Sequence, residues 1–557
     1  MAGGLLNLIA NNNSNNANIY FIGNPNTCFF YTTYNQFCNF GVQNFRIDYN
    51  GSNTLQQNTP TYITFNISRY ADLLTDTYLV LTLPDIFSPV YRDNNNTDIS
   101  FASLDFKWIK DIGTNIIRDI TIKIDGDIIQ QYSGSYIKNV VERDYDAQRL
   151  DLFNRMIGNV PEIHSPATTT NTTEYPNSQS IYPNSIGLDS YPSIKSRQLF
   201  IPVNSWFSHA NYLAFPLIAL QYQILSIEFT LRPLSDLYVI RDLDNVNQFS
   251  HRLTPYIRPT GAPIYNLATF TSRYPDYLES TTINGDISLN TILPSFNIHL
   301  ICRQVFLSED QRNYFAKNQQ QYIFRDIREH ITHDIVASNK IDIVSHALVS
   351  GWMWYLQRSD IKSRNEWSNY TNLEYENYNN NGRLIIHDLD LTNINYTQNP
   401  AVNDTSGIFI RPVYDVQHET EILTALAIVC DGAYREQFFS SGVYRYLDVF
   451  KTCNGASKTG LYFYSFTLEN NSSKIQPYGF FNTNFFKKTE LEFTTLTPNI
   501  DPTSNNVVAT CDEDGNIISV SKSNQSLYDY TYTFTLQEER YNIITFASGM
   551  ASLQIPR

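Results

Sequence analysis

The chain has 557 residues, more than one hydrophobic core usually supports, so two domains are expected. Hydrophobic residues make up 42% and charged residues only 17%, which excludes an intrinsically disordered chain. The formal net charge of −15 argues against a broad phosphate-binding surface, which needs clustered Lys and Arg, so no direct nucleic-acid binding is expected.

Alternating apolar and polar residues predict strands in the first half of the chain, at 62–67, 78–83 and 225–231. Asp125-Gly126 separates two apolar runs and supplies the positive φ angles of a tight hairpin turn. The apolar spacing of residues 135–157 predicts a helix.

In the second half, Ser308 and Gln311 form a capping-box pattern that predicts a helix running towards Tyr322. Asp514-Gly515 predicts a second hairpin turn, and residues 530–536 alternate as a strand. A chain with many such strands and few helices is typical of β-sandwiches with helices in their connections.

Four long stretches lose the alternation and are rich in Asn, Ser, Thr, Pro and Tyr. They are predicted as surface loops between strands, and loops of this length are usually functional or disordered. The second stretch also separates two strand-rich halves and is the best candidate for a domain junction. The stretches are 158–196, 235–295, 358–421 and 499–525.

A faint internal repeat connects the two halves. Ile227–Thr230 reads Ile-Glu-Phe-Thr, and Leu491–Thr494 reads Leu-Glu-Phe-Thr late in the second half. Each follows a loop that contains a proline, Pro216 and Pro477 respectively. The pattern fits duplication of a single sandwich domain.

The cysteines predict neither a zinc site nor a disulfide framework, because their spacing fits neither. No run of apolar residues is long enough for a transmembrane helix, and the apolar start at Leu5–Ala10 lacks the basic residues of a secretory signal. We therefore expect synthesis in a reducing cytoplasm. The six cysteines are Cys28, Cys38, Cys302, Cys430, Cys453 and Cys511.

The densest group of potential metal ligands is Glu329-His330-x-x-His333-Asp334. On a helix the two histidines would share a face, but the stretch is placed at a helix-to-strand junction and lacks the i, i+4 spacing of zinc peptidases. Solvated or structural histidines are the preferred interpretation, and no metal residue is predicted.

Other motifs lack the residue spacing that a binding site would require. Asp512–Asn516 is not continued as a calcium loop and fits a hairpin turn instead. Gly455–Gly460 lacks the glycines of a phosphate-binding loop, and the carboxylates Asp388 and Asp390 fit a solvated face. No catalytic or cofactor-binding residue is predicted, and the chain is not expected to be an enzyme. A glycan-cleaving or carbohydrate-binding β-sandwich remains an alternative, since the two carboxylates of a glycosidase need not be close in sequence.

Blocks along nearly the whole chain resemble the major capsid proteins of nucleocytoplasmic large DNA viruses. The most specific runs from Leu199-Phe200-Ile201-Pro202 through Trp206-Phe207 to Ala214–Tyr222, like the end of that family's first jelly roll. Phe306–Arg312 resembles the start of the second. Further blocks are Asn18–Pro25 with Phe29-Phe30, Ile67–Leu73, Trp108 with Ile112-Gly113, Gly460–Phe466, Gln476–Gly479 and Tyr541–Met550.

The resemblance implies an all-β fold of two consecutive antiparallel eight-stranded jelly rolls, with a few short helices and long loops. The implied domains are an N-terminal arm at 1–19, a first jelly roll at 20–235, a linker or insertion at 236–295 and a second jelly roll at 296–557.

In function, the resemblance implies a virion protein that forms homotrimeric, pseudo-hexagonal capsomers of an icosahedral capsid. Its partners would be neighbouring capsomers and minor capsid proteins, with possible proximity to an internal viral membrane. The usual serine after Gln-Pro is replaced by Tyr478. This departure leaves open a minor or accessory capsid paralogue on the same fold.

Overall fold

The computed structural model divides into two compact units, Met1–Gly41 and Val42–Arg557. In the first unit, residues 24–32 and 34–39 form no helix or strand, and Phe29, Phe30 and Phe37 are exposed. The structure describes residues 3–6, 24–32, 34–49, 54–87, 90–93, 99–102, 104–164, 192–242, 267–271, 293–363, 365–372, 421–471, 476–498, 508–511, 517–521 and 530–555.

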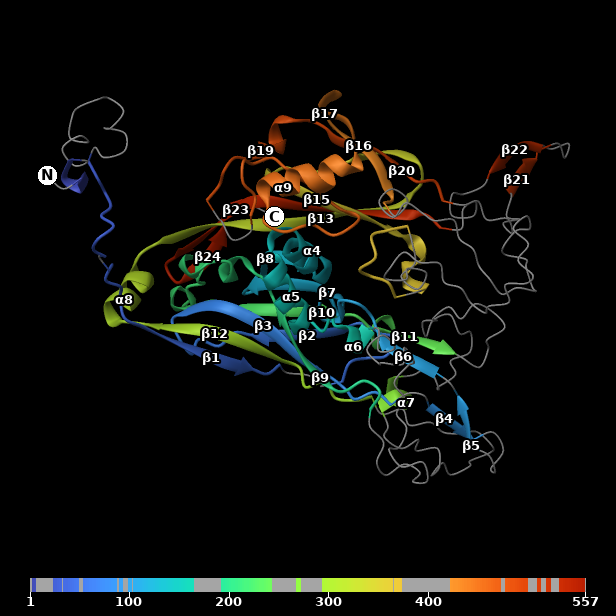
Figure 1. Cartoon of the computed structure of the whole chain (residues 1–557), viewed down its shortest axis with the longest axis horizontal. Coiled ribbons are helices and arrows are strands. Elements are labelled where there is room, and N and C mark those ends of the chain that lie inside the picture. The colour runs from blue at the N-terminus through green and yellow to red at the C-terminus, as the bar shows by residue number, and fades with distance from the viewer. Residues whose placement is uncertain are drawn as a thin grey trace. The chain divides into compact units, whose positions relative to one another are not determined.

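The first jelly roll consists of two antiparallel four-stranded sheets (Figure 1). One sheet has the order β1 (Phe40–Ile47), β12 (His299–Leu307), β3 (Leu73–Leu83) and β9 (Arg197–Pro202). The other has the order β2 (Thr61–Asn66), β10 (Leu225–Leu231), β7 (Ile117–Ile124) and β8 (Asp127–Ser133).

The second jelly roll repeats this plan. One sheet has the order β13 (Gln320–Ile335), β23 (Tyr532–Ala547), β15 (Leu348–Arg358) and β18 (Leu461–Ser465). The other has the order β14 (Ser338–Asp342), β20 (Thr489–Thr495), β16 (Leu423–Cys430) and β17 (Ala433–Ser440).

The two rolls have the same topology. When the eight strands of either roll are numbered along the chain, one sheet reads 1-8-3-6 and the other reads 2-7-4-5. The predicted fold class, two eight-stranded jelly rolls, is therefore confirmed. The internal repeat is confirmed as well, since Ile227–Thr230 lies in β10 and Leu491–Thr494 lies in β20, the seventh strand of each roll.

The remaining elements lie in the connections. Short strands are β4 (Val90–Asp93), β5 (Ile99–Ala102), β6 (Leu104–Trp108), β11 (Tyr238–Asp242), β19 (Phe481–Asn482), β21 (Val508–Cys511), β22 (Ile517–Ser521) and β24 (Met550–Leu553). Helices are α3 (Ile112–Asn115), α4 (Gly134–Asp144), α5 (Ala147–Met156), α6 (Pro161–His164), α7 (Leu267–Thr271), α8 (Glu309–Lys317) and α9 (Asp448–Thr452). Single turns are η2 (Trp206–Ser208), η3 (Asn211–Leu213), η4 (Leu217–Ala219), η5 (Leu234–Asp236), η8 (Ser359–Ser363), η12 (Val443–Leu447) and η13 (Thr483–Phe485). Among the helices in the described ranges, none has the length and apolar character that a membrane span requires.

The hairpin at Asp125-Gly126 is confirmed: these residues have φ of 52° and 97° and join β7 to β8. In the second predicted hairpin, β21 and β22 pair antiparallel, whereas Asp514-Gly515 lies outside the described residues. The four predicted loops also lie largely outside them.

The helix predicted at 135–157 is present but divided into α4 and α5. The side chain of Asp146 accepts a hydrogen bond from the Arg149 amide (2.8 Å) and thereby caps a new helix. Ser308 is the N-cap of α8 as predicted, although its side chain makes no capping bond. The extension of that helix towards Tyr322 was wrong, because the chain enters β13 at Gln320.

The domain boundaries remain a prediction. The pairing of β12 changes the predicted end of the first roll. His299 to Val305 pair with β3, so β12 is the eighth strand of the first roll. We therefore propose that this roll extends to Leu307, and that the stretch predicted as a linker at 236–295 is an insertion between its seventh and eighth strands.

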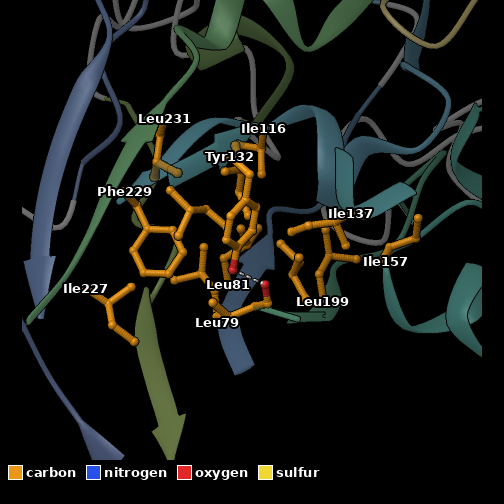
Figure 2. Packing of buried hydrophobic residues seen from close by; sticks show 14 of the residues in the cluster. Leu79, Leu81, Ile116, Tyr132, Ile137, Ile157, Leu199, Ile227, Phe229 and Leu231 are labelled. Atoms are coloured by element: carbon orange, nitrogen blue, oxygen red, sulfur yellow. Dashed lines mark hydrogen bonds between the residues drawn. The ribbon is translucent and has the colours of Figure 1, made fainter. Parts of the chain in front are cut away.

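Alternate side chains of these strands form the core of the first roll (Figure 2). Leu79 and Leu81 of β3 face Ile227 and Phe229 of the opposite sheet, and all four side chains are at most 1% exposed. The Tyr132 hydroxyl donates to the Val203 carbonyl (2.6 Å), which satisfies the polar end of a buried ring.

Replacing Leu217 by Asp tests this core, because Leu217 is 1% exposed and a charge buried there has no partner. We expect a loss of at least about 3 kcal/mol in the free energy of unfolding, with little soluble protein. Leu152→Asp is the matched control, since Leu152 is 60% exposed on α5. Thermal denaturation of both variants measures the difference, and equal melting temperatures would show that the core is misassigned. Trp206 is 1% exposed, and replacing it by Asp is predicted to have the same effect as Leu217→Asp. We expect Thr169, in a predicted loop, to tolerate Asp, but this residue lies outside the described residues.

Candidate functional site

The contact between the two jelly rolls combines buried aromatic, charged and hydrogen-bonded side chains. In β15, Trp352 and Trp354 point into the core of the second roll. Met353 and Tyr355, which alternate with the two tryptophans along the strand, are also buried, but they belong to the hydrophobic cluster of the first roll. The β13–β23–β15–β18 sheet therefore buries both faces, one in its own sandwich and one against the first roll.

An aromatic cluster forms one part of this contact. Trp206, in the connection between β9 and β10, packs against Tyr322 and Phe324 of β13, with ring centroids 5.7 and 5.5 Å apart. Phe215, from the same connection, meets Phe546 of β23 edge-on at 5.2 Å. Buried aromatic pairs of this kind add specific geometry to the area that they remove from water.

A buried charge cluster forms the other part, centred on Arg143 of α4. Its guanidinium donates to both oxygens of Asp144 (2.7 and 2.9 Å) and to Glu539 of β23 (3.0 Å). The side chains of Arg143 and Asp144 are fully buried, and that of Glu539 is 1% exposed. The guanidinium also lies over the Phe463 ring of β18, 4.6 Å from its centroid.

Hydrogen bonds from uncharged side chains continue the charge cluster along α4, which lies against the sheet of the second roll (Figure 1). The Tyr136 hydroxyl donates to Glu539 (3.1 Å), and the Asn139 amide donates to Gln537 (3.1 Å). Asn139 in turn accepts from the Tyr370 hydroxyl (3.0 Å). These bonds satisfy polar groups that would otherwise be buried without partners.

Main-chain contacts extend the interface at two further places. Gly455 donates its amide to the Arg143 carbonyl (2.8 Å), and a Cβ at this position would lie 2.5 Å from that oxygen, so only glycine fits. Asn365 donates to the carbonyls of Ser235 and Tyr238 (2.7 and 2.9 Å). Each contact joins a connection of the second roll to the first roll.

The charged residues beside the interface are paired as well. Lys138 of α4 binds Asp111 (2.9 Å) and Glu142 (3.0 Å), and the Lys138 side chain is 4% exposed. Burial raises the pKa of Asp111, but Lys138 and Lys458 lower it more, so that it falls to about 2. Asp111 is therefore a carboxylate at any physiological pH.

The structure places Glu329–Asp334 in a different context from the one predicted. These residues lie within β13 and not at a helix-to-strand junction, and in a strand an i, i+3 pair points to opposite faces. Glu329 accepts from Ser133 (2.5 Å) and Gln537 (2.9 Å), which makes it part of the contact between the rolls. Within the described ranges, no group of three or more His, Cys, Asp or Glu side chains could hold a metal ion.

The other motifs can be placed only in part. Lys458, within Gly455–Gly460, donates to the Ser368 carbonyl and lies 4.3 Å from the Tyr370 ring centroid. Burial lowers the pKa of Lys458 to about 8. Its ammonium group is thus engaged in packing and not presented to a phosphate. Asp388, Asp390 and the predicted turn at 512–516 lie outside the described residues.

Sequence reasoning missed Arg143 and Glu539. The available signal was the run Glu538-Glu539-Arg540, three charged residues in the middle of a strand that is otherwise apolar or neutral. Successive residues of a strand point to opposite faces, so this run places charges on both faces of β23. Charges that are buried on both faces need buried partners, which indicates that the strand contacts a second layer on its outer side.

Replacing Arg143 by Met tests the charge cluster, because it removes the cation that binds the buried carboxylates of Asp144 and Glu539 at 2.7 and 3.0 Å. Arg325 remains 4.0 Å from Glu539. We expect a loss of about 3–5 kcal/mol in the free energy of unfolding, measured by chemical denaturation. Arg155→Met is the control: the Arg155–Asp151 pair is 67% and 62% exposed, and removing it should cost less than about 1 kcal/mol. Equal losses in the two variants would contradict the assignment.

His330 provides a pH test. Burial lowers its pKa to about 4, with Arg328 and Arg540 acting in the same direction. The unfolded chain takes up this proton near pH 6.5 and the folded protein only near pH 4, so stability is lost as the pH falls through this window. His330→Gln should reduce that loss, as measured by melting temperatures at pH 7 and pH 4.5. NMR titration of His330 with a midpoint above pH 6 would contradict the prediction.

Comparisons with known proteins agree with the fold. A family model described as the major capsid protein N-terminus matches residues 28–255. Capsid protein 1 of Acanthamoeba polyphaga mimivirus is 28% identical over 43% of this chain and 36% of its own length. The major capsid protein of Chrysochromulina ericina virus is 25% identical over 44% of this chain and 44% of its own length. The chain thus aligns with less than half the length of these relatives, which are named as capsid proteins and not as enzymes.

Solved structures match over nearly the whole chain. The crystal structure of PBCV-1 VP54 superposes with a TM-score of 0.59 at 17% identity, covering 95% of this chain and all of that one. The Faustovirus major capsid protein gives a TM-score of 0.57 at 12% identity and covers 98% of this chain and 99% of its own. At these identities the likeness shows the double jelly-roll fold alone.

Proposed function

Because this chain is a divergent member of the major capsid protein family of nucleocytoplasmic large DNA viruses, we propose that it is a structural subunit of a virion shell. The observation that supports this most is the repeated topology: both rolls have the sheet orders 1-8-3-6 and 2-7-4-5. One chain thus contributes two similar blocks, and three chains contribute six.

In the proposed assembly, three copies form a homotrimer in which six sandwiches occupy the corners of a pseudo-hexagon. Such capsomers tile an icosahedral shell in contact with neighbouring capsomers and minor capsid proteins. The chain is made in the host cytoplasm and becomes part of the capsid. Met1–Asn18 is placed on the inner side of the shell or at a neighbour's interface, with an internal membrane possible beneath.

The longest connections support an outward placement of the loops. In the first roll these connections follow the third, fifth and seventh strands, β3, β8 and β10. In the second sheet, β8 and β10 both pair antiparallel with β7, so these two strands run in the same direction. The connections after β8 and β10 consequently leave the sandwich at the same end, which we assign to the capsid exterior.

The proposal is tested by the solution mass of the purified protein, measured by light scattering after size exclusion. We expect a species of three times 64.2 kDa that persists on dilution and shows a pseudo-hexagonal outline in electron micrographs. A folded protein that remains at 64.2 kDa at all concentrations would contradict assembly by this chain alone.

A second candidate is an accessory capsid paralogue on the same fold. Acanthamoeba polyphaga mimivirus contains two matched proteins, Capsid protein 1 at 28% identity and Probable capsid protein 4 at 26%. Copy number in purified particles separates the candidates, since a main shell protein is the most abundant and an accessory one is present at few copies.

A further inference from the structure

Glu329 of β13 is a half-buried carboxylate at the contact between the two rolls, and it binds no cation among the described residues. Its Oε1 atom accepts hydrogen bonds from the Ser133 hydroxyl (2.5 Å) and the Gln537 amide (2.9 Å), and both donors are uncharged. Glu539 of β23 differs in this respect, because it binds Arg143 (3.0 Å).

The titratable groups that face Glu329 from neighbouring elements are an acid and a phenol. Asp119 of β7 carries a like charge, which disfavours the ionised form of Glu329. From β15, the Tyr355 hydroxyl lies 3.2 Å from that of Ser135, and burial together with the Glu329 charge raises the pKa of this phenol. Burial raises the pKa of Glu329 above its ordinary value of 4.5, the two hydrogen bonds lower it by less, and Asp119 raises it further.

The arginines of the first roll in this region have other partners. Arg118 lies 3.4 Å from the Asp119 carboxylate. Arg232, which directly follows β10, stacks on Trp367 with its guanidinium 4.1 Å from the ring centroid. Neither forms an ion pair with Glu329.

The charged residues next to this site in the sequence point away from it. Arg328 and His330 flank Glu329 in β13, and successive side chains of a strand point to opposite faces. On β23, Glu538 follows the residue that pairs with Glu329 and accepts instead from Trp352, inside the second roll. The ionised form of Glu329 therefore has no charge of opposite sign on its own face of these strands to offset it.

Ser133 connects Glu329 to helix α4. While its hydroxyl donates to Glu329, the same oxygen accepts from the Tyr136 amide (3.3 Å) and so caps the helix. The Tyr136 hydroxyl bonds to Glu539, and Arg143 near the other end of the helix binds the same carboxylate. A displacement of Ser133 would thus loosen the first turn of the helix that holds the two rolls together.

We propose that Glu329 is a proton-dependent latch between the two rolls. In the protonated form, Oε1 keeps both hydrogen bonds while the other oxygen carries the proton, so no charge is withdrawn from water. In the ionised form, a partly desolvated negative charge lies at the contact without a cation, which weakens the contact. The latch lies within one chain, so it operates whether or not the chain assembles.

The direction of the pH effect follows from the raised pKa. The folded protein holds this proton more tightly than the unfolded chain, which releases it near pH 4.5. The contribution of Glu329 to stability is therefore fully present below pH 4.5 and is lost as the pH rises through the pKa of the folded state. The effect is opposite in sense to that of His330, whose protonation destabilises the fold as the pH falls.

The test compares the wild-type protein with Glu329→Gln, which keeps the hydrogen-bond acceptor and the shape but cannot ionise. Chemical denaturation at pH 4.5 and at pH 8 gives the unfolding equilibrium constant of each. We expect similar constants at pH 4.5. At pH 8 the variant should be harder to unfold, by about tenfold for each unit by which the folded pKa of Glu329 exceeds 4.5. A ratio that is the same at both pH values, or a variant that is the less stable at pH 8, overturns the proposal.

Glu162→Gln is the matched control, because Glu162 is exposed on α6 and its ratio to the wild type should change by less than about twofold between the two pH values. If Glu329→Gln fails to fold, amide hydrogen exchange of the wild type replaces it. We expect the protection of the first turn of α4, relative to that of α5, to fall as the pH rises from 4.5 to 8. A constant relative protection would contradict the latch.

Discussion

The double burial of the β13–β23–β15–β18 sheet is the constraint on which the remaining structure depends. Its inner face holds Trp352 and Trp354, and its outer face holds Met353 together with Glu539 and the ion pair to Arg143. A buried ion pair contributes little net stability, but it penalises every arrangement in which one partner is left alone. The aromatic and charged contacts together therefore select one orientation of the two rolls.

A fixed orientation is what a shell subunit with two similar blocks needs. If the rolls moved freely, the proposed trimer would present its six blocks at variable angles and could not form a regular lattice. The two blocks are alike in strand order. They differ in what surrounds them, because β17 is more exposed than the equivalent strand β8.

The fold could be predicted largely from local pattern. The alternation of apolar and polar residues predicted strands such as β2 and β10, and Asp125-Gly126 predicted a hairpin turn. Both signals depend only on residues that are close together in the sequence. The division between α4 and α5 and the end of α8 at Lys317 were missed, since a cap at Asp146 and the start of β13 override helical spacing. The partner of Arg143 lies 396 residues away, and no local pattern identifies such a pair. The assignment of β12 to the first roll likewise depends on a long-range register.

The central claim is that the two rolls form one body held by their buried contact. Scanning calorimetry of the full-length protein tests this most directly, because rolls that share a buried interface unfold together. We expect a single heat-absorption transition, which moves as one when the pH or the denaturant concentration is changed. Two resolved transitions, each shifting independently, would show that the rolls are separate domains and would contradict it.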